Sequence, residues 1–216
     1  DVLQERADTR HLAVVLARYV TGSASAMGSR NEINLDNKYI VIDTSGMPDD
    51  LLLPGIFWAT DIANDLISGA GGQLSALISD ELWSLVGANS NPLAAGYIQE
   101  MVKTIRGLGG IAITSTQGMQ DLFSLDNGKY GKGILDSSRI KIVMQMEEQE
   151  ARLIQNVLNL SEEEVRQITR FRRGEGLLCI GYNHVPIAFY ATQKEYDAIT
   201  TSPTDLLNRN IKNETV

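Results

Sequence analysis

The sequence predicts an α/β fold, with a mainly parallel sheet covered by helices and an antiparallel hairpin at one edge. Short apolar runs alternate with amphipathic segments of about a dozen residues, which is the pattern of parallel strands joined by crossover helices. Near the carboxyl end, two apolar runs flank Asn183 and His184, a polar pair typical of a hairpin turn. No internal repeat and no low-complexity segment interrupts this order.

The amino-terminal third is expected to contain two helices and two strands. Apolar residues recur at helical spacing near the start, so residues 1–29 are expected to form a helical segment that leads into the core. The apolar run 39–42 predicts a short buried strand, and helical spacing returns over residues 54–72. A second apolar run, 74–79, predicts the next strand.

The remaining elements carry start and stop signals. Asn91 and Pro92 are typical of the N-cap and first position of a helix, and Gly107 is typical of a residue just past its end. Ser161 and Glu164 have the spacing of a capping box at the start of a later helix. Further strands are expected in the apolar runs 110–117 and 140–146.

Composition limits the possible functions. The 216 residues carry a formal net charge of −8, and no segment is the basic footprint that binding to nucleic-acid phosphates needs. The single cysteine, Cys179, excludes an internal disulfide and a zinc site built from several cysteines. No apolar stretch approaches the roughly 18 residues of a membrane-spanning helix.

The start of the chain also carries information. It begins at Asp1 without an initiator methionine or a signal-peptide pattern, so we expect these residues to be a piece of a longer polypeptide. Within it, residues 30–201 are expected to form the core, and the polar residues 202–216 a loosely held tail.

Two adjacent acids, Asp80 and Glu81, follow directly after the predicted strand 74–79. In parallel α/β sheets, ligands bind outside the carboxyl ends of the strands. The position suits a Walker-B arrangement, in which an Asp holds nucleotide-bound Mg²⁺ and an adjacent Glu polarises the attacking water. The alternative is structural, with Asp80 capping the following turn and Glu81 solvated.

The phosphate-binding half of such a site is not found. A Walker-A loop has the pattern GxxxxGK[ST], in which backbone amides, a lysine and a hydroxyl hold the phosphates and the metal. The three glycine-rich stretches of the chain do not match it, because each lacks the lysine, the hydroxyl or the glycine spacing. Either the Walker-B interpretation is wrong, or the P-loop lies upstream of Asp1.

A polar pair follows the next predicted strand. Thr116 and Gln117 end the run 110–117, where the strand beside Walker B of a RecA-type motor carries a polar sensor for the γ-phosphate or the attacking water. The alternative is that this pair forms an ordinary turn. The order of the motifs favours the sensor, because an acidic pair, a Pro-started helix and a strand precede it.

Several stretches together resemble one protein family. They are "DELWSLV", "MVKTIRGLGGIAITSTQGMQDLF", "GEGLL" followed by "VPIAFYATQKEYDAITTSP", and, nearer the start, "GSASAMGSRNEINLDNKYIVIDTSGM". Their order is similar to the carboxyl-terminal part of the conjugative-transfer ATPases of type IV secretion systems, which are related to the HerA/FtsK motor clade. The resemblance covers nearly the whole chain and implies a RecA-like P-loop NTPase core that is incomplete at its amino-terminal side.

The resemblance assigns roles to matching residues around Walker B. Asp80 matches the acid that binds the Mg²⁺ of the bound nucleotide, and Glu81 matches the catalytic glutamate. Gln117 matches the glutamine at the end of the next strand. Ser79 departs from the pattern, because the family has an apolar residue at this position of the Walker-B strand.

Two arginine positions also match. Arg106 corresponds to the family's arginine just before the sensor strand, which faces the neighbouring subunit's nucleotide; a planar, permanently charged fork suits a transition-state phosphate. Its alternative is a basic residue in the last turn of a helix, where the helix dipole favours it. Arg173, beside Arg172, is a weaker candidate for a phosphate or intersubunit contact, and a solvated basic patch is the alternative.

The implied function is ATP hydrolysis, with Mg²⁺ and ATP as cofactors, that drives pilus assembly and the transfer of DNA or protein. The implied protein is a hexameric ring in the bacterial cytoplasm, peripherally associated with the inner membrane and partnered by secretion-channel and coupling proteins. The fragment alone is expected to be inactive because it lacks the P-loop. Two alternatives stay open: a DNA-translocating motor of the coupling-protein or FtsK type, and a non-enzymatic interaction domain that keeps the fold.

Overall fold

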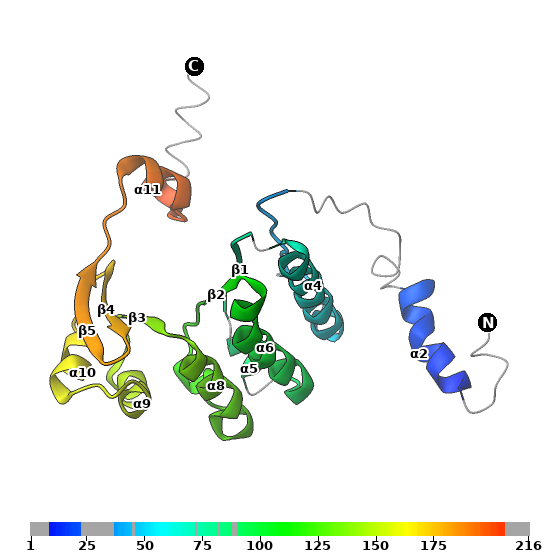
Figure 1. Ribbon diagram of the computed structural model, residues 1–216, viewed down its shortest axis with the longest axis horizontal. Coiled ribbons are helices and arrows are strands. Elements are labelled where there is room, and N and C mark those ends of the chain that lie inside the picture. Colours follow the sequence, from blue (N-terminus) through cyan, green and yellow to red (C-terminus); the bar gives the residue numbers. More distant parts are fainter. Residues whose placement is uncertain are drawn as a thin grey trace, which may run out of the picture. The chain divides into compact units, whose positions relative to one another are not determined.

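The computed structural model describes residues 9–22, 37–44, 46–71, 73–81, 83–87 and 90–205 (Figure 1). The chain divides into two compact units, one formed by residues 1–77 with 107–111, and the other by residues 78–106 with 112–216. The described elements are helices together with a short parallel sheet and a separate antiparallel sheet of three strands, so the predicted α/β class is confirmed.

Two α-helices lie among the described residues of the first unit, α2 (Arg10–Val20) and α4 (Asp49–Gly69). The predicted opening helix is therefore present, although residues 1–8 and 23–29 of its expected range lie outside the described residues. Helix α4 begins after Pro48 and includes Pro54, which has no amide hydrogen to donate within the helix.

The predicted strand at residues 39–42 is wrong. No strand is assigned there, and the side chains of Tyr39 and Val41 are 80% and 70% exposed. An apolar run becomes a strand only when another strand pairs with its backbone groups, and no described strand does so here.

A parallel pair of strands positions the candidate site. Strands β1 (Ser75–Ser79) and β2 (Gly110–Thr114) are neighbours in a two-stranded sheet. Three helical elements make the crossover that parallel pairing requires: α5 (Trp83–Val86), α6 (Pro92–Thr104) and the 3-10 helix η1 (Ile105–Leu108). Both predicted strands are thus confirmed, and their carboxyl ends lie at the same edge.

The start of α6 is as predicted from the sequence. The side chain of Asn91 accepts a hydrogen bond from the amide of Leu93 at 2.8 Å, and Pro92 occupies the first position, where no amide partner is needed. The apolar side of α6 is buried together with residues of α5, α7 (Met119–Leu122) and α8 (Lys129–Ser137). The buried residues of these helices include Val86, Ala94, Ala95, Ile98, Met101, Leu122, Tyr130 and Ile134.

Helices α7 and α8 approach each other at Gly131, after the short 3-10 helix η2 (Leu125–Gly128). A Cβ at Gly131 would lie 2.8 Å from Leu122 Cγ and closer still to the Leu122 carbonyl oxygen. The contact therefore requires glycine, because the opposing atom is backbone and cannot rotate away.

We expect Gly131→Ala to lower the free energy of unfolding by about 1–3 kcal/mol, since the added methyl group forces α7 and α8 apart. Gly96→Ala, in α6, is the matched control: its Cβ would lie 3.7 Å from the Tyr130 ring, an ordinary contact, and alanine favours a helix by roughly 0.5–1 kcal/mol over glycine. Denaturant unfolding of both variants measures the difference. Equal stability of the two variants would contradict the close contact.

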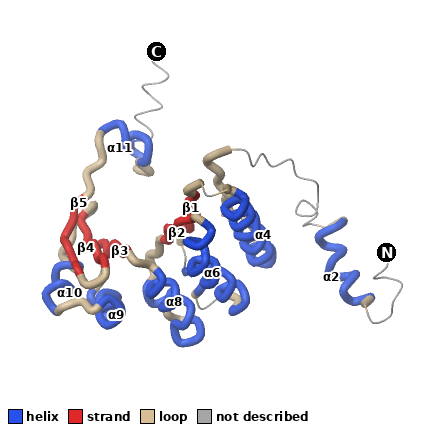
Figure 2. The backbone as a smooth tube through the Cα atoms, viewed as in Figure 1, coloured by secondary structure: helices blue, strands red, loops and turns tan. Residues whose placement is uncertain are grey.

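A second sheet is antiparallel, with the order β3-β4-β5. Its strands are β3 (Ile140–Met144), β4 (Glu175–Ile180) and β5 (Asn183–Ala188), which Figure 2 shows side by side. Leu178 pairs with Ile142 on one side and with Val185 on the other. The predicted hairpin is confirmed, but its turn is Gly181-Tyr182, because Gly181 supplies the positive φ (61°) that a two-residue turn requires. Asn183 and His184 belong to β5 instead.

The core beside this sheet comes from alternate strand positions and from two helices, α9 (Glu148–Leu158) and α10 (Glu162–Ile168). The buried residues include Val143, Ala151, Ile154, Leu158, Val165, Ile168, Leu177 and Cys179. Burial raises the pKa of the Cys179 thiol, as expected for a cysteine in an apolar core.

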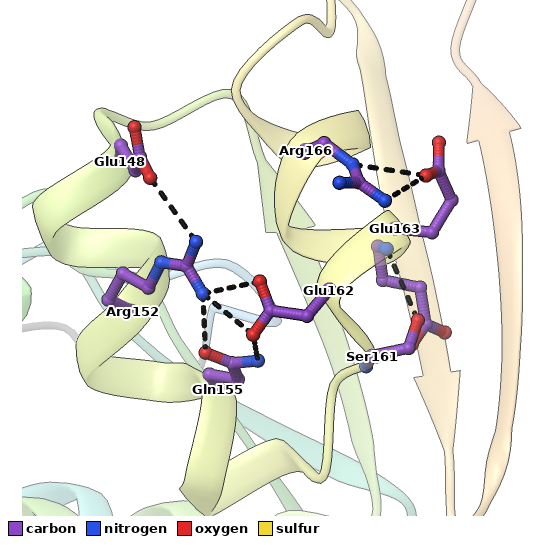
Figure 3. A network of polar contacts seen from close by, with 8 residues as sticks. Glu148, Arg152, Gln155, Ser161, Glu162, Glu163 and Arg166 are labelled. Carbon is purple, nitrogen blue, oxygen red and sulfur yellow. Dashed lines mark hydrogen bonds and ion pairs between the residues drawn. The ribbon is translucent and has the colours of Figure 1, made fainter.

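Polar side chains join α9 to α10 (Figure 3). Arg152 of α9 donates hydrogen bonds to both carboxylate oxygens of Glu162, at 2.8 and 2.6 Å, and forms an ion pair with Glu148 at 3.3 Å. The predicted capping box is present, because Glu164 accepts from the Ser161 amide at 2.7 Å while the Ser161 hydroxyl accepts from the Glu164 amide.

The carboxylate of Glu164 also contacts His184 of β5, with 2.7 Å between Oε1 and Nδ1. Partial burial opposes ionisation of Glu164, but hydrogen bonds from Ser161 and His184 outweigh it and lower the pKa of this carboxyl. One side chain therefore both begins α10 and ties that helix to the sheet. Helix α11 (Gln193–Ile199) begins with a second capping box, formed by Thr192 and Glu195.

Candidate active site

Two pairs of polar residues meet at the carboxyl ends of the parallel strands. Asp80 and Glu81 follow β1, and Ser115 and Gln117 follow β2. The amide of Ser115 donates to the carbonyl of Ser79 at 2.9 Å, so the pairing of the two strands continues into the site. All four polar residues belong to the second unit.

The carboxylate of Asp80 is exposed and fixed through one oxygen. Its Oδ1 accepts a hydrogen bond from the Glu81 amide at 3.1 Å and another from the Ser115 hydroxyl. No residue in the described part of the chain donates to Oδ2. One carboxylate oxygen is therefore held by the protein, and the other remains available to a ligand.

Glu81 has an unusual backbone conformation. Its φ is +52°, in the left-handed region, which costs a residue with a side chain of order 1–2 kcal/mol. The turn is stabilised by Ser84, whose amide and hydroxyl donate to the Glu81 carbonyl at 2.9 and 2.8 Å. The side-chain Oε1 of Glu81 accepts from Nε2 of Gln117 at 2.5 Å. The structure thus directs this glutamate toward the end of β2.

Ser115 and Gln117 are two positions apart, and exposure alternates along residues 115–117, so their exposed side chains lie on the same face. Thr116 lies between them, and its Oγ1 is buried without a hydrogen-bond partner among the described residues. The sequence indicated Thr116 and Gln117 but not Ser115. The signal that could have identified Ser115 is its i, i+2 spacing from Gln117.

Arg106 lies apart from these residues. It is exposed in η1, before the amino end of β2, whereas Gln117 follows the carboxyl end. The five residues of β2 alone span about 16 Å. Arg106 therefore precedes the amino end of β2, whereas Asp80 and Glu81 lie at the carboxyl ends of the two strands.

Arg173 is also separate from the acidic pair. It lies in the turn that precedes β4, where the Glu175 amide donates to the Arg172 carbonyl at 2.9 Å. Its charge acts on Asp205: a hydrogen bond from Tyr196 is the largest cause of the lowered pKa of that carboxyl, and Arg173 lowers it further. No described contact joins Arg173 to the site.

The side chains at the strand ends suit one of the ligand positions of Mg²⁺. This ion is bound in nucleotide sites through one or two carboxylates, with water and substrate phosphates completing the octahedron. Asp80 offers one fixed, exposed carboxylate with a free oxygen, which fits that role. Within the described part of the chain, no group of three or more His, Cys, Asp or Glu residues could hold a metal by itself.

None of the described helices is both long enough and apolar enough to cross a bilayer.

Comparisons with known proteins identify the family. The chain matches VirB4 of Thermoanaerobacter pseudethanolicus with a TM-score of 0.78 and 26% identity, over 90% of this chain and 53% of that chain. It therefore spans about half the length of that VirB4 chain. The genome packaging NTPase B204 from Sulfolobus turreted icosahedral virus 2, in complex with ATP-gammaS, matches with a TM-score of 0.51 and 17% identity, over 84% of this chain and 90% of that one. This second likeness concerns the fold alone.

No curated protein matches the sequence. The family model of the TraG P-loop domain matches residues 2–207, nearly the whole chain. The expected relationship to conjugative-transfer ATPases is thereby confirmed. The chain belongs to the TraG P-loop domain family.

Proposed function

We propose that this chain supplies the water-activating half of an ATPase site in a type IV secretion motor. One observation carries the proposal: Asp80 and Glu81 after β1 are each tied to a side chain after β2, namely to Ser115 and Gln117. Two acids that only capped a turn would not need partners from the neighbouring strand. The family and the match to VirB4 support ATP as the substrate.

Each residue has a distinct role in the proposed site. Asp80 would hold the Mg²⁺ that accompanies ATP, which would supply positive charge beside the phosphates. Glu81 accepts a proton from the attacking water, and Gln117 orients Glu81 through its amide nitrogen. The side-chain oxygen of Gln117 can accept a hydrogen bond from the attacking water, and the second hydrogen on its amide nitrogen can be donated to the γ-phosphate.

The phosphate-binding half of the site is proposed to lie outside these residues. None of the 216 positions begins a GxxxxGK[ST] pattern, and the chain spans about half of the matched VirB4. Without the P-loop lysine and hydroxyl, the β- and γ-phosphates lose their main ligands. We therefore propose that residues 30–201 form an ATPase core fragment that by itself does not hydrolyse ATP.

Arg106 is proposed to act on the nucleotide of a neighbouring subunit. Its exposure and its place at the other end of β2 suit a contact across a subunit boundary rather than within one site. This role requires a closed ring, and a hexamer is proposed from the family resemblance. Arg173 stays a weaker candidate for a phosphate or intersubunit contact.

The proposed cellular setting follows from the same relationship. The motor would work in the cytoplasm, at the inner membrane of a bacterium, with secretion-channel and coupling proteins as partners. It would drive pilus assembly and the transfer of DNA or protein. The net charge of −8 gives no support to extensive contact with DNA.

Asp80→Asn tests the proposal in the natural full-length polypeptide that contains these residues. We expect ATP turnover in Mg²⁺ to fall by about 10–100-fold or more, because the amide cannot replace an anionic metal ligand. Phosphate release measures the effect, with Asp136→Asn, an exposed aspartate in α8, as the matched control. The 216 residues alone should release no phosphate.

Two results would contradict the proposal. Unchanged turnover after Asp80→Asn would remove Asp80 from the metal site, and turnover by the isolated 216 residues would remove the need for an external P-loop. Adding double-stranded DNA to the same assay separates the motor types, since strong stimulation favours a DNA-translocating motor over an assembly motor.

A further inference from the structure

We propose that Ser115 is a positioning residue that fixes the carboxylate of Asp80 for the divalent cation. This inference rests on the proposed function and names a residue that the sequence pattern did not indicate. Ser115 lies directly after β2, and its hydroxyl donates a hydrogen bond to Asp80 Oδ1. It does not touch the reacting atoms; it acts through Asp80.

The backbone holds Ser115 in place for this contact. Its amide donates to the Ser79 carbonyl at 2.9 Å, which ties it to the residue immediately before Asp80. The donor and the acceptor of the side-chain bond are therefore carried by two strand ends that are themselves hydrogen-bonded. A hydroxyl on such a support loses little conformational freedom when it donates to the carboxylate.

The two donors on Oδ1 restrict rotation of the carboxylate. The terminal torsion of an Asp side chain is broad, so a carboxylate with a single partner rotates easily. The Glu81 amide, after β1, donates to Oδ1 at 3.1 Å, and the Ser115 hydroxyl, after β2, donates to the same oxygen. With Oδ1 fixed by both, Oδ2 points in a set direction.

A set direction matters for Mg²⁺ more than for most cations. Mg²⁺ demands nearly ideal octahedral geometry and loses its waters reluctantly. A carboxylate whose orientation varies is therefore a poor ligand for it. Residues that hydrogen-bond to a metal ligand without touching the metal commonly change metal affinity by 10–100-fold. Ser115 has the position and the chemistry of such a residue.

Thr116 provides an internal comparison. It is adjacent to Ser115 and also carries a hydroxyl, but its Oγ1 is buried without a partner in the described part of the chain. Thr116→Val keeps the shape of the side chain and removes a hydroxyl that makes no contact with Asp80. It is therefore the matched control for the loss of a hydroxyl at Ser115.

The test measures metal binding directly, without turnover. In the full-length polypeptide that carries Glu81→Gln, Mn²⁺ is titrated in the presence of ATP and free Mn²⁺ is followed by electron paramagnetic resonance. We expect Ser115→Ala to raise the Mn²⁺ concentration at half-saturation about tenfold. Ser115→Thr should restore it to within about twofold, because the hydroxyl is kept, and Thr116→Val should leave it unchanged.

Thermal unfolding of the same variants separates positioning from stability. Ser115 is exposed, so Ser115→Ala is expected to keep the unfolding temperature of the parent while losing Mn²⁺ affinity. Unchanged Mn²⁺ affinity in Ser115→Ala would overturn the inference. So would a loss of affinity that Thr116→Val reproduces, or one that Ser115→Thr does not repair.

The inference and the proposed function fail in different ways. In one outcome, the unmodified polypeptide hydrolyses ATP and Glu81→Gln removes this turnover. If the Ser115→Ala variant then still binds Mn²⁺ normally, only the role of Ser115 is wrong. If the polypeptide shows neither turnover nor nucleotide-dependent Mn²⁺ binding, the proposed function is wrong and the role of Ser115 is wrong with it.

Discussion

Glu81→Gln is expected to lower ATP turnover by the full-length polypeptide by at least about 100-fold while nucleotide still binds. A glutamine has the size and shape of the glutamate but cannot accept the proton of the attacking water. Its side-chain oxygen can still accept the hydrogen bond from Gln117 Nε2, which spans 2.5 Å in the structure. The change therefore removes the chemistry of Glu81 and leaves its position intact.

Phosphate release and binding of a fluorescent ATP analogue measure the two quantities separately. Glu100→Gln is the matched control, because Glu100 is an exposed glutamate of α6 that is remote from the site in the chain. The control should keep both turnover and binding. Turnover that survives in Glu81→Gln would show that another group activates the water, and the interaction-domain alternative would gain support if turnover were absent from every variant.

Arg106→Ala is expected to reduce turnover by about 10³-fold or more, the range typical of an arginine supplied to a transferring phosphoryl group. A further effect is expected when subunits of two different variants are mixed in one ring. Subunits with Arg106→Ala keep Glu81, and subunits with Glu81→Gln keep Arg106. If Arg106 acts across a subunit boundary, a ring that contains both kinds has some complete sites.

Random mixing in equal amounts should then restore turnover to about a quarter of the unmodified rate, since one boundary in four combines an intact Glu81 with an intact Arg106. If Arg106 acts within its own subunit, no mixture has a complete site and turnover stays absent. Arg139→Ala is the matched control, because Arg139 is also an exposed arginine that precedes a strand in the chain. It should behave as the unmodified protein, alone and in mixtures.

Local signals in the sequence predicted local structure well. The Asn91 cap, the proline at the first helical position and the Ser161 capping box all occur as expected. Helix caps depend on hydrogen bonds between residues at most three positions apart, so the local sequence is enough to predict them. The strands β1 and β2 were predicted for a similar reason, because their apolar runs are bounded by turn residues.

Prediction was weaker where pairing decides the structure. The run 39–42 has the composition of a strand, but composition does not reveal whether another strand is present to pair with it. The hairpin was expected, yet its turn was placed two residues late. The polar character of Asn183 and His184 is visible in the sequence, whereas the turn is decided by the positive φ of Gly181, which glycine adopts without a steric penalty.

The sequence by itself determined the α/β class, the strands β1 and β2 and the acidic pair at the end of the first of them, because these depend on periodicity and on residue type. The tertiary structure decided which side chains meet the acids. Asp80 and Ser115 are 35 positions apart, and Glu81 and Gln117 are 36 apart. Contacts over such separations follow from the register of β1 against β2, which is set by strand pairing and by packing of the crossover helices rather than by any local pattern.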